Sequence, residues 1–177
     1  MTDMKEYGEA LFLLAEEEGV ADGVREDLLI LDSVIKENPD YLKILDTPAL
    51  AKEERLALIE EAIGRLNRYA VNLVKLLSER RLAALVPSVI DSYLLRYDAA
   101  RAIERVEAIS AVKMTDAQLR ALRERLEAET GKSVIITNTV DPAILGGMKL
   151  RYMGIQLDGS LKTRLDSLEK NLRNILI

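Results

Sequence analysis

The first hundred residues alternate between apolar and polar positions with the period of an α-helix. Apolar residues recur three and four positions apart in segments that Gly19, Asn38-Pro39 and Pro48 separate. These segments lie near residues 3–19, 22–36, 56–66, 72–77 and 87–97. Because each stripe must bury one face against the others, this part of the chain predicts an all-α bundle of about six helices with short connections.

From about residue 105 the pattern changes to short strands around one helix. Val106, Ala108 and Val112 alternate with polar residues as in a β-strand. Thr115 and Gln118 then have the spacing of a capping box, in which each side chain bonds the other residue's backbone N–H. This pair predicts a helix that runs to about residue 130.

Two β signals follow Gly131, which would end that helix. The β-branched run SVIITNTV at 133–140 predicts a buried strand. Alternation on both sides of Met153-Gly154 predicts a β-hairpin, and a leucine stripe over 161–175 predicts a last helix. The order β-α-β-β-α describes a small α+β domain, so the fold class of the whole chain is α+β.

We therefore expect two domains, a helical bundle at 1–104 and an α+β domain at 105–177. Charge is spread unevenly between them. Up to Glu104 there are 13 basic and 21 acidic residues, a balance of −8, whereas from Arg105 onward there are 12 and 9, a balance of +3. This asymmetry is typical of two parts that meet different partners, although two ordinary solvated surfaces fit it equally well.

The composition removes most catalytic chemistry. The chain has no cysteine and no histidine, which excludes disulfides, thiolate metal sites, Ser-His and Cys-His nucleophilic pairs and most zinc or non-haem iron sites. No apolar run approaches the roughly 18–20 residues that a membrane-spanning helix needs. We therefore expect a binding or structural protein without cofactor, metal or catalytic residues, and without a membrane span of its own.

One candidate for nucleotide binding is the stretch around Lys132 together with Gly146-Gly147. Gly131-Lys132-Ser133 resembles the end of a phosphate-binding P-loop, but Leu126 stands where the pattern needs glycine. The predicted helix also precedes this stretch, whereas a P-loop precedes its helix. A nucleotide-binding domain is the alternative function. An RNA-binding α+β module is a third, but Tyr152 is the only aromatic residue of this half, so no stacking platform is present.

Three segments carry a resemblance to a known family. They are YGEALFLLAEE at 7–17, NLVKLLSERRLAALVPSVIDSY at 72–93 and DPAILGGMKLRYMGIQLDGSLKTRL at 141–165. Through them the chain resembles, over essentially its whole length, the delta subunit of bacterial F-type ATP synthase, the counterpart of the mitochondrial oligomycin-sensitivity-conferring protein. Two dipeptides depart from the family: Glu79-Arg80 stands where Asn-Gly is usual, and Met153-Gly154 where Gly-Asp is usual.

The resemblance implies a non-catalytic stator subunit, peripheral to the cytoplasmic face of the bacterial cell membrane and bound to that membrane only through the complex. Its N-terminal domain would hold the N-terminal helices of the alpha subunits, and its C-terminal domain the end of the peripheral stalk of b subunits; no nucleic acid is expected. The family's alpha-subunit groove lies between the first and fifth helices. The candidate interface residues there, which would equally suit a plain core, are Tyr7, Leu11, Leu14, Leu73 and Leu76.

Overall fold

A computed structural model describes residues 4–144, 147–152 and 155–158. The chain forms two compact units, an N-terminal unit of residues 1–100 and a C-terminal unit of residues 101–177. The boundary expected from the sequence, after residue 104, lies four residues further along and falls inside the first β-strand.

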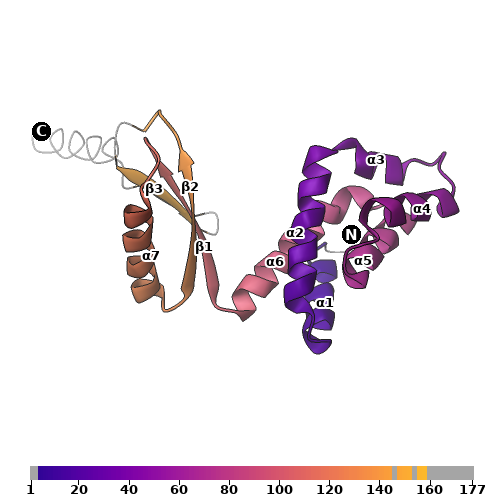
Figure 1. The fold of residues 1–177 in the computed structure, drawn as a ribbon, viewed down its shortest axis with the longest axis horizontal. Coiled ribbons are helices and arrows are strands. Elements are labelled where there is room, and N and C mark those ends of the chain that lie inside the picture. Colours follow the sequence, from indigo (N-terminus) through magenta and orange to yellow (C-terminus); the bar gives the residue numbers. More distant parts are fainter. Residues whose placement is uncertain (1–3, 145–146, 153–154, 159–177) are drawn as a thin grey trace, which may run out of the picture. The chain divides into compact units, whose positions relative to one another are not determined.

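Helices account for the regular structure of the N-terminal unit in its described residues (Figure 1). They are α1 (Met4–Glu17), α2 (Ala21–Glu37), α3 (Asp40–Asp46), α4 (Lys52–Ile63), α5 (Arg68–Glu79), the 3-10 helix η1 (Ala83–Leu85) and α6 (Val86–Ala100). The expected bundle of about six helices is therefore confirmed.

Tyr93 of α6 lies at the centre of this unit. Its side chain is fully buried, and its ring meets the Phe12 ring edge to face with centroids 5.7 Å apart. The Tyr93 hydroxyl donates a hydrogen bond of 2.8 Å to the carbonyl oxygen of Ala21, at the start of α2. Because a buried tyrosine needs such a partner, this bond fixes α2 against the α1–α6 pair.

The sequence missed α3 and misplaced the end of α4. Asn38-Pro39 ends α2 as expected, but the segment after it, in which no helix was predicted, forms a helix of seven residues. Leu66, the last residue of the predicted helical segment 56–66, lies outside α4, which stops at Ile63. The side chain of Asn67 accepts a 3.0 Å hydrogen bond from the Tyr69 N–H and starts a separate helix, α5.

A clear break separates α5 from α6, although Glu79-Arg80 stands where the resemblance led us to expect Asn-Gly. Arg81 takes a left-handed backbone with φ of 57°, and its guanidinium donates a 3.0 Å hydrogen bond to the Asp46 carbonyl oxygen. The Asp46 carboxylate accepts from the backbone N–H groups of Ala83 and Ala84. Contacts from α3 therefore stabilise a turn that could not be predicted from the local sequence.

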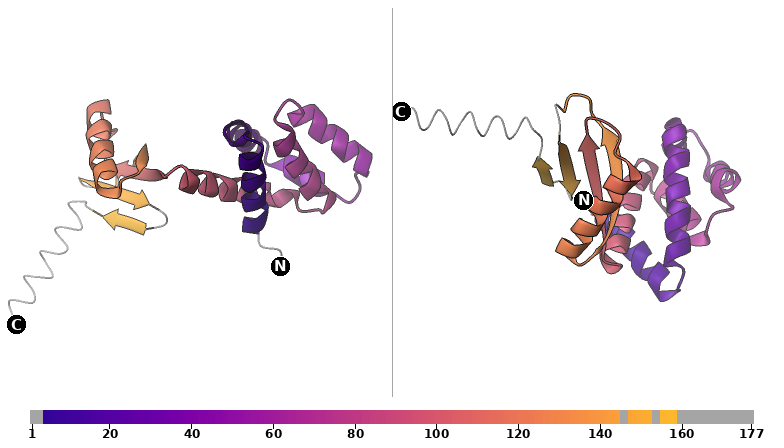
Figure 2. Two further views of the ribbon diagram at one scale, coloured as in Figure 1. Left: turned by 90° about the horizontal axis from the view of Figure 1, so that it is seen from below. Right: turned by 60° about the vertical axis from the view of Figure 1, so that its left-hand side comes forward.

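The C-terminal unit contains a four-stranded sheet and one described helix. The elements are β1 (Ile103–Ser110), α7 (Asp116–Thr130), β2 (Ser133–Val140), β3 (Met148–Tyr152) and β4 (Ile155–Asp158). The strand order is β2-β1-β3-β4; β1 pairs parallel with β2 and antiparallel with β3, and β3 pairs antiparallel with β4. Figures 1 and 2 show α7 against one side of the sheet, so the α+β class is confirmed.

Two details of this sheet differ from the sequence predictions. The run 133–140 is β2 as expected, but the prediction that it is buried was wrong, because β2 is an edge strand and only Val134 in it is buried. Val112, expected within the first strand, lies beyond the end of β1 and is 73% exposed. Apolar β-branched residues do not distinguish an edge strand from a central one.

The predicted hairpin is present in its strands. Tyr152 pairs with Ile155 and Leu150 with Leu157, in the register expected for a two-residue connection. The connecting residues 153–154 and the predicted last helix at 161–175 lie outside the described residues.

Candidate functional site: a groove between α1 and α5

A groove of about 300 Å³ runs between α1 and α5. It is lined by Tyr7, Ala10, Leu11 and Leu14 of α1 and by Tyr69, Asn72, Leu73 and Leu76 of α5. All five residues that the family resemblance singled out, three on α1 and two on α5, line this one groove, although Leu14 and Leu73 are 59 positions apart in the chain. The structure thus brings the candidate residues together on one surface.

Close packing of α1 on α6 sets one wall of the groove. A Cβ atom at Gly8 would lie 2.5 Å from the Ser92 Cβ and 2.7 Å from the Val89 carbonyl oxygen, so only glycine allows this approach. The Ser92 hydroxyl also donates a 3.0 Å hydrogen bond to the Lys5 carbonyl oxygen. The side of α1 that carries Gly8 packs against α6. The side that carries Tyr7, Leu11 and Leu14 therefore lines the groove toward α5.

Capping contacts set the other wall. Besides accepting from Tyr69, Asn67 donates its backbone N–H to the Asp27 carboxylate at 2.6 Å. This bond ties the first turn of α5 to α2, and it satisfies an N–H group that would otherwise lack a partner at a helix start. The position of α5 along the groove is therefore held from outside the groove.

The depth of the groove separates its leucines into two pairs. Leu11 and Leu73 are 8% and 6% exposed, and they form the floor as part of the core. Leu14 and Leu76, by contrast, are 41% and 40% exposed. Single exposed leucines are ordinary on protein surfaces, but two from different helices in one apolar groove indicate a surface that a partner covers.

Charged side chains stand at the two ends. At one end the Arg80 guanidinium donates a 2.8 Å hydrogen bond to the Tyr7 hydroxyl. At the other end Arg68 lies 3.8 Å from the Glu18 carboxylate, and its guanidinium lies over the Tyr69 ring, 4.8 Å from the ring centroid. Because Tyr7 precedes Glu18 and Arg68 precedes Arg80, these contacts also show that α1 and α5 run in opposite directions.

A larger hollow of about 560 Å³ lies at the turn between α2 and α3. Its lining includes the exposed polar residues Glu37, Asn38 and Asp40, and Asp40 already forms a 2.7 Å ion pair with Lys43. Size alone therefore favours this hollow. An apolar wall with two half-exposed leucines suits an apolar partner better, so the α1–α5 groove is the stronger candidate.

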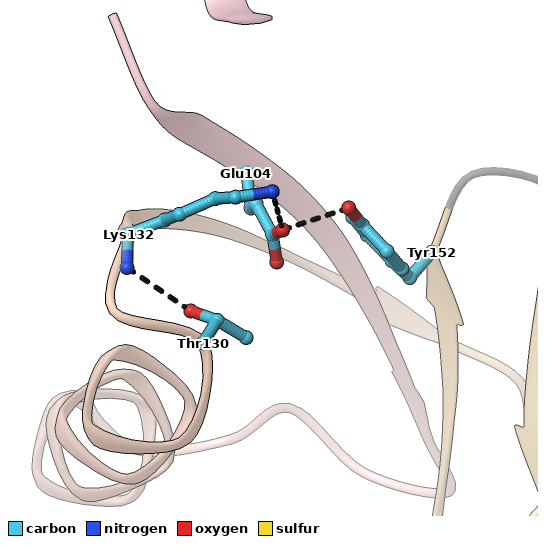
Figure 3. A network of polar contacts seen from close by, with 4 residues as sticks. All are labelled: Glu104, Thr130, Lys132 and Tyr152. Carbon is cyan, nitrogen blue, oxygen red and sulfur yellow. Dashed lines mark hydrogen bonds and ion pairs between the residues drawn. The ribbon is translucent and has the colours of Figure 1, made fainter.

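Lys132, the candidate for nucleotide binding, is engaged within the C-terminal unit. Its ammonium group lies 2.6 Å from a carboxylate oxygen of the buried Glu104, and the Tyr152 hydroxyl donates to the same oxygen at 2.8 Å (Figure 3). Gly131 ends α7 with φ of 68°, so this segment is a helix C-terminus. A phosphate site would require a helix N-terminus, where free N–H groups point at the anion. Gly146 lies outside the described residues.

These hydrogen bonds shift the pKa values of all three side chains, Glu104, Lys132 and Tyr152. The bonds from Lys132 and Tyr152 hold the pKa of the Glu104 carboxyl below its ordinary value. The bond to Glu104 raises the pKa of the Lys132 ammonium and that of the Tyr152 hydroxyl. The two hydrogen bonds stabilise the ionised carboxylate of Glu104 and the protonated forms of its two donors. The three residues thus link β1, the α7–β2 turn and β3 as a structural cluster.

The described part of the chain offers neither a metal site nor a membrane span. Within residues 4–144, 147–152 and 155–158, no acidic residues gather in a group of three or more that could hold a metal ion. In those same residues, no helix combines the length and the apolar character that crossing a membrane requires.

Ala10, Tyr69 and Asn72 complete the groove but were not predicted from the sequence. A signal for Tyr69 was available, because Tyr69, Leu73 and Leu76 are spaced four and three residues apart and so share one face of α5. Ala10 and Asn72 gave none, since small and polar residues do not mark an apolar stripe.

Comparison with known proteins places the chain in a family. The family model described as "ATP synthase delta (OSCP) subunit" matches residues 4–172. Among curated relatives, the ATP synthase subunit delta of Anaeromyxobacter dehalogenans is 33% identical over 171 residues, 96% of each chain. The ATP synthase subunit delta of Lactobacillus johnsonii is 32% identical over 167 residues, 94% of this chain and 92% of that one.

A solved structure agrees on the fold. A chain in the cryo-EM structure of the Toxoplasma gondii mitochondrial ATP synthase hexamer superposes with a TM-score of 0.75, at 20% identity, over 97% of this chain and 98% of that one. With the family model and the relatives spanning nearly the whole sequence, the chain belongs to the ATP synthase delta (OSCP) subunit family.

Proposed function

We propose that this protein is a non-catalytic stator subunit that links the catalytic hexamer of an F-type ATP synthase to its peripheral stalk. Torque from the central rotor would turn the hexamer unless a static connection held it. Such a connection needs a long-lived protein contact and no chemistry. Family membership supports the setting, and the absence of cysteine and histidine from the chain agrees with a role without catalysis.

The first contact in this proposal is the α1–α5 groove, which would receive an N-terminal helix of an alpha subunit. The observation that carries it is the pair of half-exposed leucines, Leu14 and Leu76, that face one apolar groove from two helices. An amphipathic helix binds such a groove by inserting apolar side chains at positions i, i+3 or i+4, and i+7. Tyr69 and Leu76, which line the α5 wall of the groove, are seven residues or about 10 Å apart along the helix axis. This length equals the distance between positions i and i+7 of a bound helix.

The second contact would be made by the C-terminal unit, to the end of the b-subunit stalk. The positive balance of this half, against the acidic first half, supports a separate partner. Two linked contacts within one assembly also strengthen each other, because the second forms at a high effective concentration once the first has formed. The protein would then lie at the cytoplasmic face of the membrane, held there by the complex.

Titration calorimetry with a synthetic peptide of the cognate alpha subunit's N-terminal helix tests the first contact. We expect binding to the full chain, and loss of affinity in the double variant Leu14→Gln/Leu76→Gln. Burial of each leucine contributes roughly 1–2 kcal/mol, so the double variant should bind about thirtyfold or more weakly.

Leu13→Gln is the matched control, since Leu13 is adjacent to Leu14, is 66% exposed and does not line the groove. Its affinity should equal that of the wild type. A wild-type chain that gives no heat and no competition at tens of micromolar peptide would refute the proposed contact. Retention of labelled ATP by the isolated chain in equilibrium dialysis would instead favour the nucleotide-binding alternative.

A further inference from the structure

On each of the two helices that form the groove, a charged residue lies one helical turn after the exposed leucine. Directly after α1 that residue is Glu18, and directly after α5 it is Arg80; the N–H of each still bonds the carbonyl oxygen of the exposed leucine four positions before it, Leu14 or Leu76. Residues four apart lie on the same face of a helix. Since α1 and α5 run in opposite directions, the two charges stand at opposite ends of the groove.

Arg80 has a neutral partner. Its guanidinium donates to the Tyr7 hydroxyl at 2.8 Å, and no carboxylate of the described residues lies within 4.0 Å of it. The neighbouring acid, Glu79, pairs instead with Lys52 at 2.9 Å. Arg80 is exposed, and a guanidinium carries five N–H donors, so most of its donors point to solvent or to an incoming ligand.

The opposite end is acidic. Glu16, Glu17 and Glu18 close α1 or follow it directly, and all three are exposed. The Glu18 carboxylate lies 3.8 Å from the Arg68 guanidinium, which donates its hydrogen bond to the Tyr69 hydroxyl at 2.7 Å instead, so Glu18 is not hydrogen-bonded to Arg68. The groove is therefore apolar in the middle, positive at the Tyr7 end and negative at the Leu14 end.

The two ends act independently. Arg68 and Arg80 are twelve residues apart on and just after α5, which corresponds to about 18 Å along the helix. At physiological ionic strength electrostatic interactions between exposed charges are screened over about 8 Å. A partner helix must therefore satisfy each end with its own side chain.

We infer, resting on the proposed function, that the helix in this groove carries a carboxylate where it meets Arg80 and a basic side chain where it meets Glu18. Apolar side chains over about two turns separate the two, and the charges stand about twelve residues apart. Arg80 selects the partner and fixes its register, because a helix placed one turn out of register would leave its carboxylate away from the guanidinium.

Calorimetry on the full chain, with the alpha-subunit peptide at low and at physiological salt, tests this inference. Arg80→Gln should weaken binding roughly two- to fivefold, the range for an exposed ion pair, and should flatten the salt dependence. Arg80→Glu replaces attraction by repulsion and should weaken binding about tenfold. The control Arg123→Glu makes the same charge change at an exposed position of α7 and should leave affinity unchanged.

A second variant separates recognition from a structural role. Tyr7→Phe removes the hydroxyl that accepts from Arg80 and keeps the charge, so the salt dependence of binding should equal that of the wild type even where the changed groove contact alters the affinity itself. If Tyr7→Phe flattens the salt dependence as much as Arg80→Gln does, or if Arg80→Glu binds like Arg123→Glu, the inference is wrong. Both outcomes leave the proposed function standing, because the wild type still binds.

The peptide supplies the reciprocal measurement. Changing its acidic residues to lysine one at a time should identify one position at which the changed peptide loses affinity for the wild type and regains it with Arg80→Glu. Absence of any such position overturns the inference. Failure of the unchanged peptide to bind the wild-type chain is a different result, and it would count against the proposed function itself.

Discussion

Gly8 lies where α1 packs on α6, and its missing side chain allows the two helices to approach each other. The space that a Cβ atom would need is occupied by the Ser92 side chain and by the backbone oxygen of Val89. A flexible side chain could move away, but a helix backbone cannot do so without displacing its own turn. The position of α1, and with it one wall of the groove, therefore depends on this single residue.

We expect Gly8→Ala to destabilise the protein by about 1–2 kcal/mol, the cost of overpacking less the gain in helix propensity. Gly23→Ala on α2 is the control, because a Cβ atom there would meet nothing within 4 Å. This control should be stabilised by roughly 0.5–1 kcal/mol. Urea unfolding of both variants measures the difference; equal effects of the same sign would show that the close approach is not maintained.

At the scale of the elements, Glu104 connects three parts of the C-terminal unit: two strands and a turn. This residue belongs to β1, and it accepts from Lys132 in the α7–β2 turn and from Tyr152 on β3. Glu104 is 7% exposed, so its charge depends on these two donors rather than on water. The cluster fixes the edge strand β2 and the hairpin strand β3 on either side of β1.

The stabilisation by this cluster should depend on pH in a defined direction. The pKa of Glu104 is lowered below 4.5, so its contribution is complete above that value and is lost as pH falls through the lowered pKa. The raised pKa of Lys132 places the loss of its contribution above pH 10.5. Between about pH 7 and pH 3, therefore, only the carboxylate titrates within the cluster.

We expect Glu104→Gln to unfold at a lower temperature than the wild type at pH 7, and the gap between them to narrow as the pH falls below 4.5. Thermal unfolding followed by circular dichroism at several pH values measures this gap. The exposed Glu124→Gln on α7 should follow the wild type throughout. A gap that stays constant with pH would show that Glu104 contributes packing rather than charge.

Long periodic elements could be read from the sequence, and contacts between elements could not. The stripes of α2 and α6 and the capping box of Thr115 with Gln118 are local patterns, and each appears where expected. The helix α3 and the turn at Arg81 depend on partners far along the chain, such as the bonds from Asp46 to the start of η1. Contacts between residues so far apart in the chain cannot be predicted from local sequence patterns.

The leucines of the groove could be predicted, but the charged residues at its two ends could not. The leucines of α1 and α5 carry an apolar signal, and the family resemblance indicated which two helices to pair. Arg80 looked like a departure from the family pattern, and only the fold places it beside Tyr7 at the mouth of an apolar surface. Edge position was equally hidden for β2, whose composition resembles that of a central strand.

At the scale of the whole molecule, two compact units carry two surfaces of different charge. The first unit is acidic and offers an apolar groove, while the second half of the chain is basic in balance. In the proposed stator role the protein holds two partners at once, and losing either contact would release the connection. Variants of the groove should therefore abolish coupling even though they leave the second unit unchanged.

Proton pumping by inverted membrane vesicles stripped of this subunit tests the stator role most directly. Stripped vesicles supplied with the catalytic sector should hydrolyse ATP without pumping protons, and added wild-type chain or Leu13→Gln should restore pumping. Leu14→Gln/Leu76→Gln should not restore it at the same concentration, while ATP hydrolysis continues. Pumping without any added chain, or full restoration by the double variant, would contradict the proposal that the α1–α5 groove anchors the catalytic hexamer.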